Sequence, residues 1–200
     1  VPGAAVENAR ASIAEQIASI ELPEGYDMKW EGEKSASNES MKYLFKYYPL
    51  AVILMIAILI ALFKDYRKPA IIVLCLPLLF IVVIFGMMLS GKTFGFVAIV
   101  ATLGLVGMLI KNGIVLMDEI TLQINAGKEP VDALMESSAS RFRPVMLASL
   151  TTILGMIPLL GDSLFGPAAV VIMGGLLVGT LITLLFIPVL YALFYRIRIK

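Results

Sequence analysis

The stretch GMLIKNGIVLMDE, residues 107–119, places one lysine, Lys111, inside an otherwise apolar run. Uncharged runs of about 20 residues are long enough to cross the hydrocarbon core of a bilayer. A charge at bilayer depth costs roughly 2.5–3.5 kcal/mol on insertion scales, so such a residue usually has a functional reason to be there. The role of Lys111 has to be inferred from the rest of the sequence.

The composition is that of an integral membrane protein. Of the 200 residues, 60% are hydrophobic and 16% are charged, and the mean hydropathy is +0.93, outside the range of soluble domains. The net charge of +1 comes with no clustered basic face, so we expect no nucleic-acid partner. The chain contains no histidine, which removes the common zinc sites and histidine-assisted nucleophiles. We therefore expect neither an enzyme nor a bound metal or cofactor.

Five apolar runs predict five transmembrane helices, of which only the third contains an ionisable residue deep inside. The runs cover about residues 45–63, 69–90, 94–117, 144–161 and 168–194. Lysine and arginine are concentrated after the first, third and fifth runs. By the positive-inside rule, this places the carboxy terminus in the cytoplasm and residues 1–40 on the opposite side. An apolar stripe behind Pro130 predicts a short helix along the cytoplasmic surface, over about residues 130–140.

Two smaller features concern packing. The segment GLLVG, residues 175–179, has small residues four positions apart, a pattern that lets membrane helices approach closely. We expect it to serve packing within the bundle rather than a dedicated dimer contact. Cys75 lies in an apolar run, where a thiolate is disfavoured, so we expect it to be a packing residue.

The amino-terminal segment predicts a small part of a domain outside the membrane. Residues 2–20 have helical apolar spacing, and Tyr26, Met28 and Trp30 alternate with charged residues, as in a strand with one buried face. A single strand cannot satisfy its backbone groups, so its partners should belong to upstream chain. We expect a fragment of a longer protein, with an α/β remnant over residues 1–40 and a transmembrane domain over residues 41–200.

Two interpretations of Lys111 remain open from its residues. Its side chain could reach along the helix to water near Asp118, seven residues and about 10 Å away. Alternatively, it faces the interior of a bundle and pairs with an acid. The acids of this helix, Asp118 and Glu119, lie at its cytoplasmic end, and Asp162 lies on the opposite side of the membrane. A counter-ion at the depth of Lys111 would therefore have to come from upstream chain.

Several stretches together resemble the carboxy-terminal membrane half of resistance-nodulation-division (RND) efflux transporters, in family order and at family spacing. They are GLVGMLIKNGIVLMDEI (104–120), RFRPVMLASLTTILGMIPL (141–159) and MGGLLVGTLITLLFIPVLYAL (173–193), preceded by LPEGYDMKWEGE (22–33). The segment LPEGYDMKWEGE resembles the end of the second periplasmic (porter/docking) loop. The resemblance implies an all-α membrane protein, with the five helices corresponding to helices eight to twelve of a twelve-helix bundle.

The resemblance also implies a function and a proton relay. Family members are trimeric pumps of the Gram-negative inner membrane that work with a periplasmic adaptor and an outer-membrane channel, driven by the proton gradient. Lys111, with Asn112 beside it, matches a family lysine that pairs with aspartates on the fourth helix. Arg141 matches an arginine near the cytoplasmic exit of the proton, although Arg141 and Arg143 also fit simple positive-inside anchoring.

One position departs from the family pattern. Where many drug exporters have a threonine, this chain has Ala148, followed by Ser149 and then by Thr151 and Thr152. We count these three hydroxyls as candidate relay residues in its place. The simpler alternative is that they bond back to the preceding helical turn, as serine and threonine often do within helices.

The resemblance further favours small hydrophobic or amphiphilic substrates, because heavy-metal exporters of the superfamily tend to have an acid where Lys111 stands. The expected function is thus proton-driven export of such compounds. A membrane bundle that senses lipid or acts as a scaffold, with Lys111 reaching lipid headgroups, is the alternative.

Overall fold

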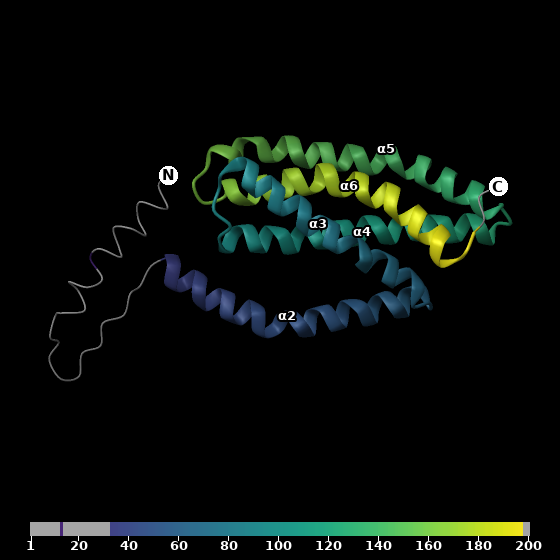
Figure 1. The fold of residues 1–200 in the computed structure, drawn as a ribbon, viewed down its shortest axis with the longest axis horizontal. Helices are drawn as coiled ribbons and strands as arrows, with labels where there is room; N and C mark the ends of the chain where they lie inside the picture. The colour runs from purple at the N-terminus through teal and green to yellow at the C-terminus, as the bar shows by residue number, and fades with distance from the viewer. Residues whose placement is uncertain (1–12, 14–32, 198–200) are drawn as a thin grey trace. The chain divides into compact units, whose positions relative to one another are not determined.

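The computed structural model describes residue 13 and residues 33–197, and in this part of the chain all regular structure is helical (Figure 1). The elements are α2 (Glu33–Phe63), α3 (Arg67–Ser90), α4 (Phe96–Asn125), α5 (Pro130–Met156), the 3-10 helix η1 (Ile157–Gly161) and α6 (Gly166–Phe194). Five of these segments are long and apolar enough to cross a membrane. The prediction of an all-α membrane protein with five spans is confirmed.

The chain divides into two compact units, residues 1–45 and residues 46–200. The expected amino-terminal helix over residues 2–20 and the strand around Tyr26 to Trp30 lie outside the described residues, apart from Ile13, which is helical and exposed. The described helices of residues 46–200 position the candidate site, and the fold below is that of this unit.

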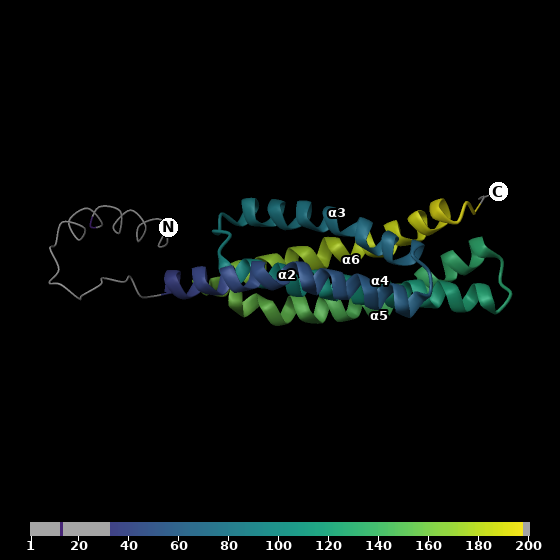
Figure 2. The ribbon, with the colours of Figure 1, turned by 90° about the horizontal axis from the view of Figure 1, so that it is seen from below.

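α6 is the central helix of this unit. It packs against α3, α4 and α5, and it runs alongside them in both views (Figures 1 and 2). Its buried face carries Gly175 and Gly179, where a Cβ atom would lie 2.0 Å and 2.9 Å from side-chain carbons of Leu105 and Leu109 on α4. The small-residue pattern therefore packs α6 against a neighbouring helix of the same chain, as predicted.

Two clusters of buried apolar side chains hold the helices together. One is centred on Leu116, Met117 and Ile120 of α4 and includes Leu59 from the end of α2. The other is centred on Leu105 and Leu109 and extends to the start of α6. Van der Waals packing of these side chains stabilises the contacts among the helices, because lipid is as apolar as the side chains themselves. The remaining apolar surface of α2 and α5 is largely exposed, as expected for helices that face lipid or further helices.

The prediction of a separate surface helix over about residues 130–140, followed by a span from 144, was wrong in its boundary. The structure has one continuous helix, α5, which runs through Arg141 and Pro144. Hydropathy shows where the apolar run begins and ends, but the helix can continue beyond the apolar run. Residues such as Leu134, Met135 and Glu136 are good helix formers, so the helix extends beyond the apolar run. α4 likewise continues to Asn125, beyond the predicted end at residue 117.

Three connections meet at one end of the unit: residues 64–66, residues 126–129 and residues 195–197. We call this the basic end, because each of the three connections contains a basic residue, namely Lys64, Lys128 and Arg196. Lys68 of α3 donates a hydrogen bond to Thr121 of α4 (2.8 Å), and Tyr195 after α6 donates one to Asp65.

Candidate functional site

Lys111 lies in the middle of α4. It is 15 residues from Phe96 and 14 from Asn125 (111 − 96 and 125 − 111), or about 21 Å from either end at 1.5 Å per residue. Its side chain is exposed in this chain. The helix therefore places the ammonium group far from both termini and outside the packed core.

The face of α4 that carries Lys111 is open and is lined with small residues next to the lysine. Exposed residues recur along this face at helical spacing: Val100, Gly104, Gly107, Lys111, Val115, Asp118 and Leu122. No atom lies within 4 Å of where a Cβ would stand at Gly104 or Gly107. The opposite face, with Leu105, Leu109 and Gly113, is buried against α3 and α6. A further helix could thus approach closely beside Lys111.

The described chain supplies no acidic partner for Lys111. The ion pairs among residues 13 and 33–197 are Lys128 with Glu136 and Arg141 with Glu119. Asp118, on the same open face, lies about 10 Å along the helix toward the basic end. Asn112 is half-buried beside the lysine. The ammonium group is therefore unpaired within the part of the chain that the structure describes.

Arg141 belongs to a second polar group, where α5 contacts α4. Its guanidinium donates to Glu119, which also accepts a hydrogen bond from Gln123 (3.1 Å). The side chain of Glu119 is only 20% exposed. Arg141 could be selected from the sequence, but Glu119 could not, because from the sequence the acids at this end of α4 are only possible partners of Lys111.

The three hydroxyl candidates on α5 are in different environments. Ser149 is buried and shares a hydrogen bond with Thr180 of α6 (2.8 Å). Thr151 and Thr152 bond back to the carbonyls of Leu147 and Ala148 (2.8 and 3.0 Å). The structure thus places Ser149 at the α5–α6 contact, whereas Thr151 and Thr152 bond within their own helix.

The candidate relay residues do not form one contiguous site in this chain. Lys111 is on the open face of α4, Ser149 is between α5 and α6, and Arg141 pairs with Glu119. Glu119 is eight residues along α4 from Lys111, or about 12 Å.

The basic end contains two further charged groups that the sequence did not single out. Lys68 is 9% exposed, and its ammonium group lies 5.6 Å from the centre of the Phe63 ring. Burial alone would raise the pKa of Asp65, but hydrogen bonds from Tyr195 and the Arg67 backbone, with nearby cations, hold that pKa below its usual value of 3.8. Burial and the Asp65 carboxylate raise the pKa of Tyr195. These contacts fix the α2–α3 connection to the end of α6.

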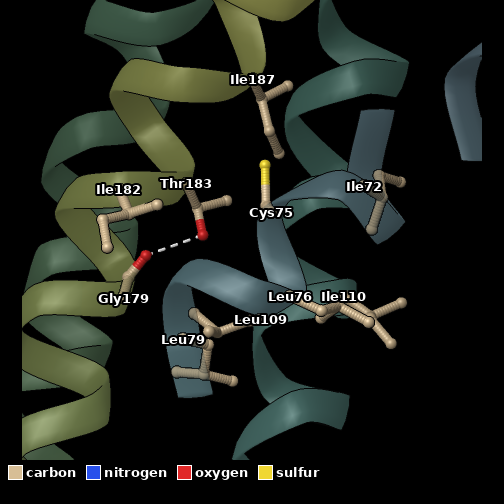
Figure 3. Close-up of a pocket in the computed structure, with 10 residues that line it drawn as sticks. All are labelled: Ile72, Cys75, Leu76, Leu79, Leu109, Ile110, Gly179, Ile182, Thr183 and Ile187. Carbon is tan, nitrogen blue, oxygen red and sulfur yellow. Dashed lines mark hydrogen bonds between the residues drawn. The ribbon is translucent and has the colours of Figure 1, made fainter. Parts of the chain in front are cut away.

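A small apolar cavity lies between α3, α4 and α6 (Figure 3). Its volume is about 10 Å³, space for at most one water molecule. Cys75 lines it and is buried, which confirms the packing role predicted for this residue. Thr183 in the wall bonds back to the carbonyl of Gly179 (2.8 Å). The cavity is a packing defect in the helix contacts and is too small to hold a substrate.

The described residues contain no group of three or more His, Cys, Asp or Glu side chains that could hold a metal ion. They contain instead the cation of Lys111, unpaired among the described residues, in the middle of α4, and the polar group of Glu119, Gln123 and Arg141 nearer the end of that helix. Five membrane-length helices are typical of a multi-pass membrane protein. Residues 1–195 match the AcrB/AcrD/AcrF family, and the chain belongs to this family of RND efflux transporters.

Curated relatives include transporters of two kinds. The chain is 28% identical over 204 aligned residues to the multidrug resistance protein MdtC of Serratia proteamaculans, covering 99% of this chain and 20% of that protein. It is 29% identical to the nickel and cobalt resistance protein CnrA of Cupriavidus metallidurans, covering 98% of this chain and 18% of CnrA. The chain therefore spans about a fifth of the length of these relatives.

Solved structures of a heavy metal efflux pump have the same fold. In two crystal forms the TM-scores are 0.71 and 0.67, each at 26% identity, covering 96% of this chain and 19% of the pump chain. Relatives named for multidrug resistance and for metal resistance thus both match this chain, and family membership alone does not define the substrate.

Proposed function

We propose that this chain acts within a longer pump polypeptide as part of a proton-driven exporter of hydrophobic or amphiphilic compounds. Membership of the RND family supports export as the activity. The observation that carries the proposal is the position of Lys111 in the middle of α4, on a face that the described part of the chain leaves open.

An ammonium group in hydrocarbon is costly unless it is paired or hydrated. Lys111 is seven residues, or about 10 Å, from Asp118, where the apolar run of α4 ends, and a lysine side chain covers only part of that distance. Gly104 and Gly107 leave room beside it for another helix. We infer that carboxylates from a helix outside this chain cover this face and neutralise the lysine.

Such a pair can act as a two-state element. When the carboxylates are ionised, they hold the ammonium group. When protons bind to them, the attraction is lost and α4 can shift relative to its partner. Because α4 is packed along its opposite face against α6, a shift of α4 changes the helix contacts of this unit. Arg141 lies at the α4–α5 contact and Ser149 at the neighbouring α5–α6 contact, and we include both, with Asn112, in the proposed relay. Thr151 and Thr152 remain weaker candidates because they bond within their own helix.

Organic compounds are our proposed substrate class. The resemblance ties lysine at this position to exporters of hydrophobic compounds, and the described residues offer no metal-ligand cluster. The relatives include both a multidrug and a nickel and cobalt resistance protein, so a metal ion is the alternative that an assay must include. Trimer formation, a periplasmic adaptor, an outer-membrane channel and an inner-membrane location belong to the same proposal.

The test uses the full-length transporter reconstituted in liposomes with an imposed pH gradient. Export of a cationic amphiphilic dye, rhodamine 6G, is measured beside transport of Ni²⁺. We expect gradient-dependent dye export that is lost in Lys111→Ala, with unchanged trimer assembly. Dye export at the wild-type rate in this variant contradicts the proposed mechanism, and transport of Ni²⁺ without dye contradicts the proposed substrate class.

The exposure of Lys111 in this chain also fits a bundle that does not transport, in which the ammonium group contacts anionic lipid. Lys111→Arg distinguishes the two functions. Lipid contact tolerates arginine, whereas a pair of fixed geometry does not, because a planar guanidinium and a compact ammonium differ in shape.

A further inference from the structure

Three buried polar atoms at the α4–α5 contact have no hydrogen-bond partner. They are Gln123 Oε1, Ser137 Oγ and Arg141 Nε, and they are the buried side-chain nitrogen and oxygen atoms without a partner in the described part of the chain. Ser137 is fully buried. Buried polar groups almost always have a partner, so three in one place require an explanation.

The three atoms belong to Arg141 of the Glu119–Arg141 ion pair and to two residues that adjoin the pair along the helices. Gln123 is one turn after Glu119 on α4, and Ser137 is one turn before Arg141 on α5. Gln123 donates a hydrogen bond to Glu119 through its amide nitrogen, which places its amide oxygen close to the pair. Ser137 is on the buried face of α5, one turn from Arg141 and so next to it on the helix surface.

The chemistry of the three atoms fits one bound water. Arg141 Nε is a donor, Gln123 Oε1 is an acceptor, and the Ser137 hydroxyl can be either. Buried waters typically make about three hydrogen bonds to groups that would otherwise be unsatisfied. A water that accepts from the arginine and donates to the amide would satisfy all three atoms.

We propose that Glu119 is a positioning residue for Arg141, and that a water held by Gln123, Ser137 and Arg141 completes the site. This inference rests on the proposed function, in which Arg141 belongs to the proton relay. Glu119 fixes the orientation of the guanidinium through a charge-assisted hydrogen bond. Since Glu119 and Lys111 are on the same helix, a shift of α4 at Lys111 also changes the hydrogen bond between Glu119 and Arg141.

The test measures proton-driven export of rhodamine 6G by the full-length transporter in liposomes, per correctly assembled molecule. We expect Glu119→Gln to lower the maximal rate about tenfold, the scale of a lost hydrogen bond to a charged group, with the KM for the dye unchanged. Glu119→Asp, which keeps the charge, should recover part of the rate. Glu129→Gln makes the same chemical change at an exposed residue and should match the wild type.

The outcomes separate this inference from the proposed function. If Lys111→Ala abolishes export while Glu119→Gln retains the wild-type rate, the positioning role is wrong and the proposed function stands. If the wild type shows no proton-driven export of the dye, the proposed function itself fails. A structure of the transporter that resolves water should show density within hydrogen-bond distance of all three atoms. Direct pairing of these atoms with one another, without water, overturns the water site.

Discussion

Gly175 of α6 lies directly against Leu105 of α4, with a Cβ at residue 175 only 2.0 Å from Leu105 Cδ2 and 3.1 Å from two other carbons of that side chain. Leu105 is fully buried, so its side chain can move away from a Cβ only by displacing the side chains packed around it. The absence of a side chain at residue 175 is thus a requirement of the α4–α6 contact. This contact places the face of α4 opposite Lys111 against the core and leaves the lysine face open.

Substituting Gly175 by alanine should destabilise the bundle. Overpacking of a close contact costs about 1–3 kcal/mol, which exceeds the gain of roughly 1 kcal/mol in helix propensity from replacing glycine by alanine. Unfolding of the purified protein in detergent measures the change.

Gly174→Ala is the matched control, because no atom lies within 4 Å of a Cβ at that position. It should be neutral or slightly stabilising. Equal stability losses in Gly174→Ala and Gly175→Ala would show that helix flexibility, and not the contact with Leu105, accounts for the effect.

The hydrogen bond between Ser149 and Thr180 should contribute to the α5–α6 contact. Interhelical hydrogen bonds in membrane proteins average about 0.6 kcal/mol and reach about 1.7 kcal/mol. A double-mutant cycle of Ser149→Ala and Thr180→Val measures the coupling free energy. We expect a value within that range, and Thr151→Ala, which removes only a bond within its own helix, should show no coupling to Thr180→Val. A coupling energy of zero for the first pair would contradict the bond.

Acid should weaken the turn that precedes α6. Asp162 accepts hydrogen bonds from the backbone N–H groups of Phe165 and Leu164 (2.7 and 2.8 Å), which, with Lys92 nearby, hold the pKa of this carboxyl below 3.8. A group whose pKa is lower in the folded state stabilises the protein above its unfolded pKa and loses this contribution as the pH falls through the folded value.

The loss should therefore occur below about pH 3.8. Thermal unfolding in detergent, followed from pH 7 down to pH 2.5, measures it. Asp162→Asn keeps an oxygen acceptor but has no titrating carboxyl, so its melting temperature should fall less steeply with acid than that of the wild type. Parallel curves for the two proteins would show that Asp162 does not contribute to acid sensitivity.

The number of membrane helices could be predicted because the required length of apolar chain is set by the bilayer. Helix ends could not be predicted equally well, since charged residues such as Arg141 end an apolar run without ending a helix. The close contact of Gly175 was also visible in the sequence as a spacing of small residues, although its partner Leu105 was not.

The pairing of Glu119 with Arg141 depends on the register between α4 and α5. That register is set by the geometry of their connection and by packing against α6, which no local sequence pattern encodes. For the same reason, Ser149, Thr151 and Thr152 looked equivalent in the sequence, yet only Ser149 faces a neighbouring helix. Residue type identified the candidates, and tertiary structure distinguished among them.

The central claim is that the ammonium group of Lys111 is neutralised by carboxylates from outside this chain. The most direct test is a structure of the full-length polypeptide at neutral pH, from which the distance between Lys111 Nζ and the nearest carboxylate oxygen is measured. We predict an acidic side chain within about 4 Å, on a helix that covers Gly104 and Gly107. An ammonium group directed at lipid headgroups, with no acid within reach, would contradict it.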